Sequence, residues 1–122
     1  MPVHRRIPAT AALLLALTVL AAGCGSGSSA DKAAKATPAT GVHDVTARQL
    51  AFTPAAIQVP AGTTVTWHFD DGTVPHNVQG DGFKSPNLKK TTFQHRFDEP
   101  GTYDYVCTLH AGMTGRVVVV AG

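Results

Sequence analysis

Cysteine is scarce in this sequence, which has only two cysteines among its 122 residues. Cys24 lies near the N-terminus, whereas Cys107 lies far along the chain in a run of other potential metal ligands. A structural disulfide between these two residues is therefore not expected. Exported proteins meet an oxidising environment, so the thiol of an exported domain has to be kept occupied, and binding a metal ion does this.

The sequence also lacks a strong charge of either sign. Its formal net charge is +2, but two of the basic residues, Arg5 and Arg6, lie at the extreme N-terminus. From residue 42 onward, six basic and seven acidic residues leave a net charge near −1. Nucleic-acid binding requires a basic stripe or patch, so no nucleic-acid partner is expected. The small group formed by Lys84, Lys89 and Lys90 is more simply a solvated face than a docking site.

No apolar run is long enough for an ordinary membrane-spanning helix. The run from Ala9 to Leu20 has a dozen residues and follows His4-Arg5-Arg6, which is typical of a signal peptide. It ends in Leu20-Ala21-Ala22-Gly23-Cys24, which resembles a bacterial lipoprotein signal. In that class of protein the cysteine becomes the lipidated first residue of the mature chain. We therefore predict a signal peptide over residues 1–23 and lipidation of Cys24, with a plain secretory signal as the alternative.

Residues 24–41 are predicted to be the lipidated cysteine and a flexible linker. The segment from Gly25 to Gly41 is made of small and polar residues without an aromatic side chain, so it has little with which to build a core. Transient helix is expected only around Ala30–Ala36. Such a linker would let a domain move above a membrane surface.

Residues 42–122 are predicted to be one all-β domain. Within Thr63–Phe69, Val65, Trp67 and Phe69 alternate with polar residues, which is the pattern of a half-buried strand. The expected strands lie within Val42–Phe52, Ile57–Val59, Thr63–Phe69, Thr92–Phe97, Thr102–Cys107 and Arg116–Ala121. Turn signals such as Asp71-Gly72, Gly80-Asp81-Gly82 and Glu99-Pro100-Gly101 separate several of them. Short strands at this spacing favour a β-sandwich.

Two segments carry residues that suit a metal ion. Cys107-Thr108-Leu109-His110-Ala111-Gly112-Met113 places a thiolate, an imidazole and a thioether within seven residues, and Val74-Pro75-His76-Asn77-Val78 supplies a second imidazole. Two histidines, one cysteine and a weak methionine are the ligands of blue-copper electron-transfer sites. Each residue alone is more often structural, but the combination favours copper. Because Cys107 ends an inward-facing alternation, we expect the site at one end of the sandwich.

The sequence resembles the cupredoxins, the small blue-copper family of plastocyanin, pseudoazurin and amicyanin. The resemblance is carried by the metal-binding segments together with Phe52-Thr53-Pro54, Val59-Pro60-Ala61-Gly62-Thr63-Thr64-Val65-Thr66-Trp67, Gly101-Thr102-Tyr103-Asp104-Tyr105-Val106-Cys107 and Gly115-Arg116-Val117-Val118-Val119. It implies a Greek-key β-sandwich, with a tyrosine corner over Glu99–Tyr103. Two departures are Phe69, where many relatives have asparagine, and Ala111, where amicyanin-like loops often have proline.

The resemblance also implies a role for each residue of the site. Cys107, His76 and His110 would bind one type 1 copper ion, with Met113 as the weak axial ligand. Asn77 would tie the two ligand segments together by hydrogen bonds. His76 is expected to be buried. His110 is expected near the surface, ringed by Leu109, Ala111, Gly112 and Pro75, where electrons would enter and leave.

The predicted function is one-electron transfer outside the cytoplasmic membrane, in the periplasm or at the outer face of that membrane. No enzymatic activity is expected. The lipid anchor would keep a monomeric carrier near its redox partners, such as a cytochrome, oxidase, reductase or dehydrogenase, and their contacts would be weak and transient.

Three alternatives remain open at this stage. The protein could be an extracytoplasmic copper-handling chaperone or buffer, although it lacks a methionine-rich or histidine-rich tract. It could also be an adhesive β-sandwich that has lost its metal, and zinc could occupy the same ligands.

The other histidines of the domain, His43, His68 and His95, are expected to have structural roles.

Overall fold

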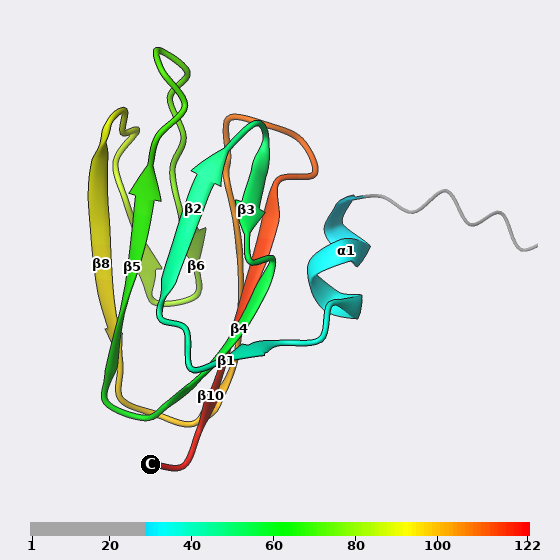
Figure 1. Cartoon of the computed structure of the whole chain (residues 1–122), viewed down its shortest axis with the longest axis vertical. Coiled ribbons are helices and arrows are strands. Elements are labelled where there is room, and N and C mark those ends of the chain that lie inside the picture. The colour runs from blue at the N-terminus through cyan, green and yellow to red at the C-terminus, as the bar shows by residue number, and fades with distance from the viewer. Residues whose placement is uncertain (1–28) are drawn as a thin grey trace, which may run out of the picture.

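The computed structural model describes residues 29–122 and forms a sandwich of two β-sheets with one short helix at its side (Figure 1). The predicted signal peptide and Cys24 lie outside the described residues. The elements are α1 (Ser29–Lys35), β1 (Ala39–Thr40), β2 (Asp44–Arg48), β3 (Ala51–Thr53), β4 (Ala56–Pro60), β5 (Thr63–Phe69), β6 (Gln79–Gly80), β7 (Phe83–Lys84), β8 (Thr91–Phe97), β9 (Gly101–Val106) and β10 (Thr114–Val120). None of the helices in this part of the chain is long and apolar enough to cross a membrane.

The two sheets bury the apolar faces of their strands against each other. One sheet has the strand order β1-β4-β10-β9-β6-β7 and the other has the order β3-β2-β5-β8. The alternation along β5 is as expected, because Val65, Trp67 and Phe69 are buried while the residues between them are partly exposed. The expected all-β sandwich is therefore confirmed.

A hairpin divides the first expected strand. Val42–Phe52 was predicted as one β-rich stretch, but β2 and β3 pair antiparallel around Gln49 and Leu50. These two residues have φ angles of 52° and 58°. Positive φ at both central residues matches the right-handed twist of the two strands. The turn contains no glycine or asparagine, so the sequence carries no ordinary turn signal there.

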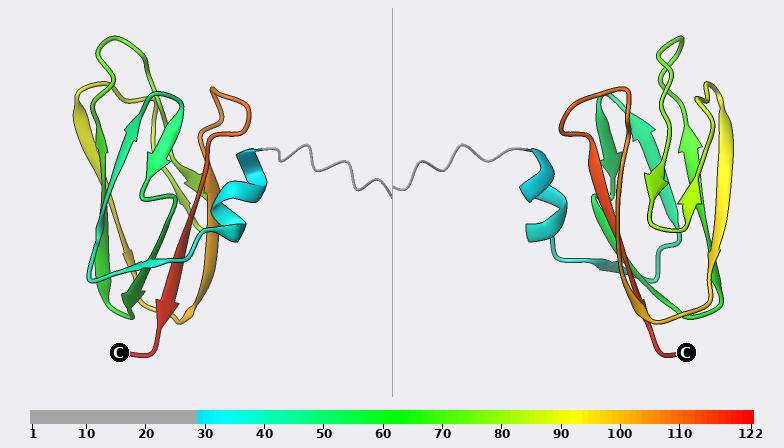
Figure 2. Two further views of the ribbon diagram at one scale, coloured as in Figure 1. Left: turned by 45° about the vertical axis from the view of Figure 1, so that its right-hand side comes forward. Right: turned by 180° about the vertical axis from the view of Figure 1, so that it is seen from behind.

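The ordered structure begins earlier than residue 42. Helix α1 lies against β10, where Ala33 is buried, and β1 pairs parallel with β4 (Figure 2). Arg116 of β10 also donates a hydrogen bond to the carbonyl oxygen of Ala34. The segment was expected to be a flexible linker because it lacks large apolar residues. Small alanine side chains nevertheless let a helix approach a strand closely, and strand pairing through the backbone needs no apolar side chain.

Tyr105 packs at the centre of the core, two residues before Cys107. Its ring meets Trp67 edge-on at 5.4 Å and Phe52 at 4.8 Å between ring centroids. Gly115 on the neighbouring strand β10 makes this possible, because a Cβ atom there would lie 2.2 Å from the Tyr105 ring. Near the start of β9, the hydroxyl of Tyr103 donates to the carbonyl oxygen of Glu99, as expected for a tyrosine corner. The rigid core therefore fixes the strand that leads to Cys107.

Candidate metal centre

Cys107 follows β9 directly and begins a short loop that leads to β10. The amide of Cys107 donates to the carbonyl oxygen of Met113, and the amide of Met113 donates to that of His110. These bonds fold the loop back on itself, which brings the three predicted ligands of this segment together. Cys107 and Met113 are buried, with 3% and 1% of their surface exposed. His110 is only partly buried.

His76 reaches the same place from the long connection between β5 and β6. Its backbone exchanges two hydrogen bonds with Leu88, one in each direction, at 3.1 and 2.8 Å. His76 is completely buried, whereas His110 is not. The structure therefore places one imidazole inside the protein and the other at its surface, as the resemblance implied.

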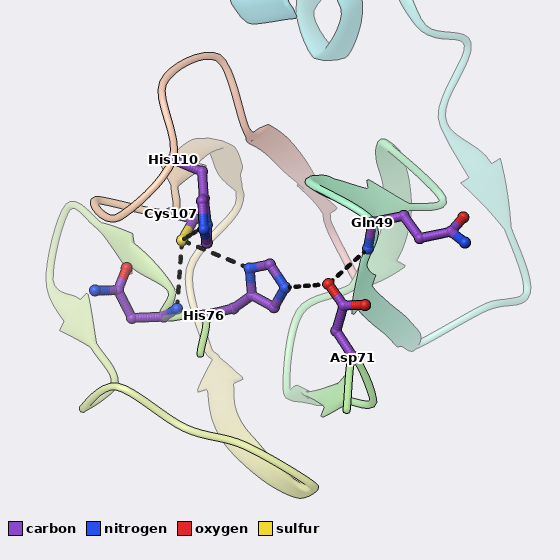
Figure 3. A network of polar contacts seen from close by, with 6 residues as sticks. Gln49, Asp71, His76, Cys107 and His110 are labelled. Carbon is purple, nitrogen blue, oxygen red and sulfur yellow. Dashed lines mark hydrogen bonds and ion pairs between the residues drawn. The ribbon is translucent and has the colours of Figure 1, made fainter. Parts of the chain in front are cut away.

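The three donor atoms lie within 4.8 Å of one another. The sulfur of Cys107 is 4.0 Å from Nδ1 of His76 and 3.5 Å from Nδ1 of His110 (Figure 3). An ion with metal–nitrogen distances of about 2.0–2.1 Å and a metal–sulfur distance of about 2.3 Å would hold trigonal donors roughly 3.6–3.8 Å apart. The spacing therefore fits one metal ion. The mixture of one thiolate and two imidazoles is the donor set of a type 1 copper site.

Asn77 connects the two ligand segments. Its side-chain oxygen accepts from the amide of Thr108, and its side-chain nitrogen donates to the hydroxyl of Thr108 and to the side-chain oxygen of Asn87. Its own amide donates to the sulfur of Cys107 at 3.5 Å. Three of these four bonds join Asn77, the residue after one predicted ligand, to Cys107 or to Thr108, the residue after it. They hold the two segments in fixed register.

Asp71 is a polar partner of the site that the sequence did not reveal. Its Oδ2 atom lies 2.9 Å from Nε2 of His76 and accepts a hydrogen bond from the amide of Gln49 at 3.0 Å (Figure 3). The hydrogen bond with His76, followed by the one from Gln49, lowers the pKa of Asp71. The only sequence signal was Asp71-Gly72 as a turn, and a turn does not indicate which side chain the carboxylate meets.

The other histidines of the domain lie apart from this cluster. Nε2 of His68 is 2.7 Å from a carboxylate oxygen of Asp44, and Nε2 of His43 is 3.5 Å from the other oxygen of that group. His95 stacks on Phe83 and meets Phe97 edge-on, and burial lowers the pKa of His95. None of the three belongs to the group of donors around Cys107.

Exposed apolar residues lie next to or near the two histidines in the sequence. Leu109 is 41% exposed, and Val74, two residues before His76, is 38% exposed. Ala111 is also exposed, while Gly112 and Pro75 are partly buried. The residues expected to surround the partly exposed imidazole therefore include exposed apolar groups.

Comparison with known proteins gives a consistent result. Residues 39–120 match the family described as copper binding proteins, plastocyanin/azurin family. The chain is 34% identical to amicyanin-alpha of Methylorubrum extorquens over 88% of this chain and 96% of the relative. It is 38% identical to amicyanin of Paracoccus denitrificans over 86% and 92%, respectively. Among solved structures, a purple cupredoxin from Nitrosopumilus maritimus is similar at 33% identity and a TM-score of 0.59, over 65% of this chain and all of that one.

Proposed function

Because this chain belongs to the plastocyanin/azurin family of copper-binding proteins, it is a one-electron carrier with one type 1 copper ion, and we propose which of its residues hold that ion. His76, Cys107 and His110 are the three close ligands, and Met113 is the weak axial ligand. The observation that carries this assignment is the mutual spacing of the Cys107 sulfur and the two Nδ1 atoms.

Copper supplies the change between Cu(II) and Cu(I), and the protein supplies a donor set that suits both states. Thiolate and thioether suit Cu(I), while imidazole suits copper in either state. The ligands are held by backbone bonds at His76 and within the loop from Cys107 to Met113. A site fixed in this way needs little rearrangement when an electron arrives or leaves. His76 is sealed inside the protein, so the partly exposed His110 is the route by which electrons pass to a partner.

The location and partners are proposed from the N-terminal sequence and from the surface. A lipidated Cys24 anchors the carrier at the outer face of the cytoplasmic membrane, and residues 1–23 direct its export. The surface at His110, where the neighbouring residue Leu109 is exposed and apolar, docks other redox proteins through a small and transient interface. The carrier acts as a monomer, has no enzymatic activity and binds no nucleic acid.

The burial of the ligands favours an electron carrier over a copper-handling protein. Cys107 and His76 are buried, and the bonds of Asn77 and the loop close the site from two sides. Rapid transfer of copper to an acceptor would require these bonds to open. A carrier retains its copper through repeated oxidation and reduction, whereas a chaperone releases it to an acceptor, and this difference is measurable.

The test is a visible absorption spectrum of the chain without its predicted signal peptide. The protein carries Cys24→Ser so that Cys107 is the only thiol, and it is loaded with Cu(II). We expect an intense blue thiolate-to-copper band that disappears with ascorbate and returns on oxidation. Cys107→Ala is expected to abolish the band, while His95→Gln, at a histidine outside the cluster, keeps it. A copper-loaded Cys107→Ala protein that still exchanged electrons would refute the ligand assignment.

A further inference from the structure

The carboxylate of Asp71 sits directly behind the buried imidazole of His76. Its Oδ2 atom lies 2.9 Å from Nε2 of His76, on the side of the ring opposite to the Nδ1 atom that faces Cys107. The side chain of Asp71 is 19% exposed, and that of His76 is completely buried. We propose that Asp71 is a positioning residue that fixes the tautomer and orientation of His76 and biases the site toward Cu(II). This inference rests on His76 being a copper ligand.

The first step of the argument concerns the proton of His76. An ionised carboxylate only accepts hydrogen bonds, so the proton of a neutral His76 ring must lie on Nε2. The Nδ1 atom then presents a lone pair toward the sulfur of Cys107 and the proposed metal position. A hydrogen bond from the other ring nitrogen is the usual way in which a protein fixes a histidine ligand and raises its basicity.

The second step concerns charge. Asp71 places a negative charge beside a buried ligand, in surroundings where water screens it only partly. Such a charge stabilises the site more when it carries Cu(II) than when it carries Cu(I), because the positive charge is larger. Asp71 therefore lowers the reduction potential. The neighbouring residue Asp70 carries the same charge but is exposed, and its described hydrogen bond is made by its backbone to Ala47.

The third step concerns the β2–β3 hairpin. The same Oδ2 atom accepts the amide hydrogen bond of Gln49, the first of the two turn residues with positive φ. One oxygen thus joins His76 to a turn from a distant part of the chain (Figure 3). The turn fixes the carboxylate, and the carboxylate fixes the imidazole, so that the position of the ring does not depend on the β5–β6 connection alone.

The experiment compares Asp71→Asn with Asp70→Asn. At either position asparagine has the same size and keeps one acceptor oxygen, while the charge is lost and an amide NH2 group replaces the second oxygen. We expect Asp71→Asn to keep the blue band and to lower the ratio of Cu(II) to Cu(I) affinity by about tenfold, which corresponds to a rise in potential of about 59 mV for one electron. Both affinities are measured on the apoprotein by competition with chelators. Asp70→Asn is expected to change the ratio much less.

A second measurement needs no variant and no metal. In the nitrogen NMR spectrum of the wild-type apoprotein, His76 is expected to carry its proton on Nε2, with slow exchange. A proton on Nδ1, or equal shifts in the potential of the Asp71→Asn and Asp70→Asn variants, would overturn the role of Asp71. Neither result would affect the copper assignment, because that assignment is tested separately by the blue band of the wild-type protein and by its loss in Cys107→Ala.

Discussion

Asn77 and Thr108 exchange two hydrogen bonds that bridge the two ligand segments. The amide of Thr108 donates to Oδ1 of Asn77 at 2.8 Å, and Nδ2 of Asn77 donates to Oγ1 of Thr108 at 2.7 Å. Asn77 is 4% exposed, so water cannot easily replace these bonds. The two residues follow the proposed ligands His76 and Cys107 directly. The protein's own hydrogen bonds therefore join the two segments that carry these ligands.

Asn77→Ala is expected to weaken the apoprotein. The substitution removes a buried side chain together with its hydrogen bonds to the amide and the hydroxyl of Thr108, which costs about 1–3 kcal/mol of the free energy of unfolding. Urea unfolding of the apoprotein measures this loss. Asn87→Ala is the matched control, because it removes only one bond of the same side chain and Asn87 is exposed. Its effect is expected to stay within about 0.5 kcal/mol. Equal effects of the two substitutions would mean that Asn77 does not tie the segments together.

The sequence predicted those parts of the molecule in which a side-chain pattern determines the structure. The alternation of Thr63–Phe69 gave the strand β5 with its observed bounds, because one face of that strand is buried. The metal-binding motif likewise predicted that His76 would meet Cys107 and His110. In the first case apolar side chains have to be buried, and in the second the side chains are the metal ligands, so the residue types alone indicate the structure.

Other features depend on contacts that no local pattern records. The Gln49–Leu50 turn has positive φ without glycine or asparagine, and the strand pairing around it maintains that conformation. Helix α1 was expected to be transient, and it packs on β10 through Ala33, a residue that is common in flexible segments as well. Asp71 meets His76 only because of the path that the β5–β6 connection takes. The sequence does not specify these long-range encounters.

Packing of α1 on β10 is tested by placing a charge on its buried face. Ala33→Glu introduces a carboxylate where the side chain is 3% exposed, so we expect the helix to leave the sheet. Trypsin then cleaves more rapidly at Lys32 and Lys35, which flank this position, because proteolysis follows the population of the open form. Ala34→Glu, at an exposed position of the same helix, serves as the control. Similar cleavage rates for both variants would argue against docking through Ala33.

Replacement of the hairpin turn by a sequence that favours positive φ is expected to stabilise the protein. The double variant Gln49→Asn, Leu50→Gly supplies the preferred residues for this turn type. Relief of left-handed strain, which amounts to roughly 1–2 kcal/mol per residue, exceeds the added flexibility of glycine. We expect a net gain of about 1 kcal/mol. The backbone amide of residue 49, which donates a hydrogen bond to Asp71, is retained, so the reduction potential of the copper site should not change.

The control for the hairpin is Leu50→Ala. Alanine keeps a Cβ atom in the left-handed conformation, and the side chain of Leu50 is 59% exposed, so little apolar contact is lost. No gain in stability is expected from this substitution. If the double variant and Leu50→Ala have the same urea midpoint, the positive φ angles of Gln49 and Leu50 do not strain the turn.

The ion pair between Asp104 and Arg116 predicts a dependence of stability on pH. Two carboxylate–guanidinium bonds, at 2.6 and 3.0 Å, join β9 to β10, and the bond from Arg116 lowers the pKa of Asp104 in the folded protein. A carboxylate with a lowered pKa stabilises the folded state above its unfolded pKa, and this contribution disappears as the pH falls through the folded value. Asp104→Asn should therefore destabilise the apoprotein at pH 7 by about 0.2–1 kcal/mol, the range for exposed pairs. The difference from the wild type should vanish in strong acid. The control is Asp98→Asn, which removes the ion pair with Arg96, in which both partners are more than 60% exposed. If Asp98→Asn changed the pH dependence of stability as much as Asp104→Asn does, the contacts of Asp104 would not be the source of that dependence.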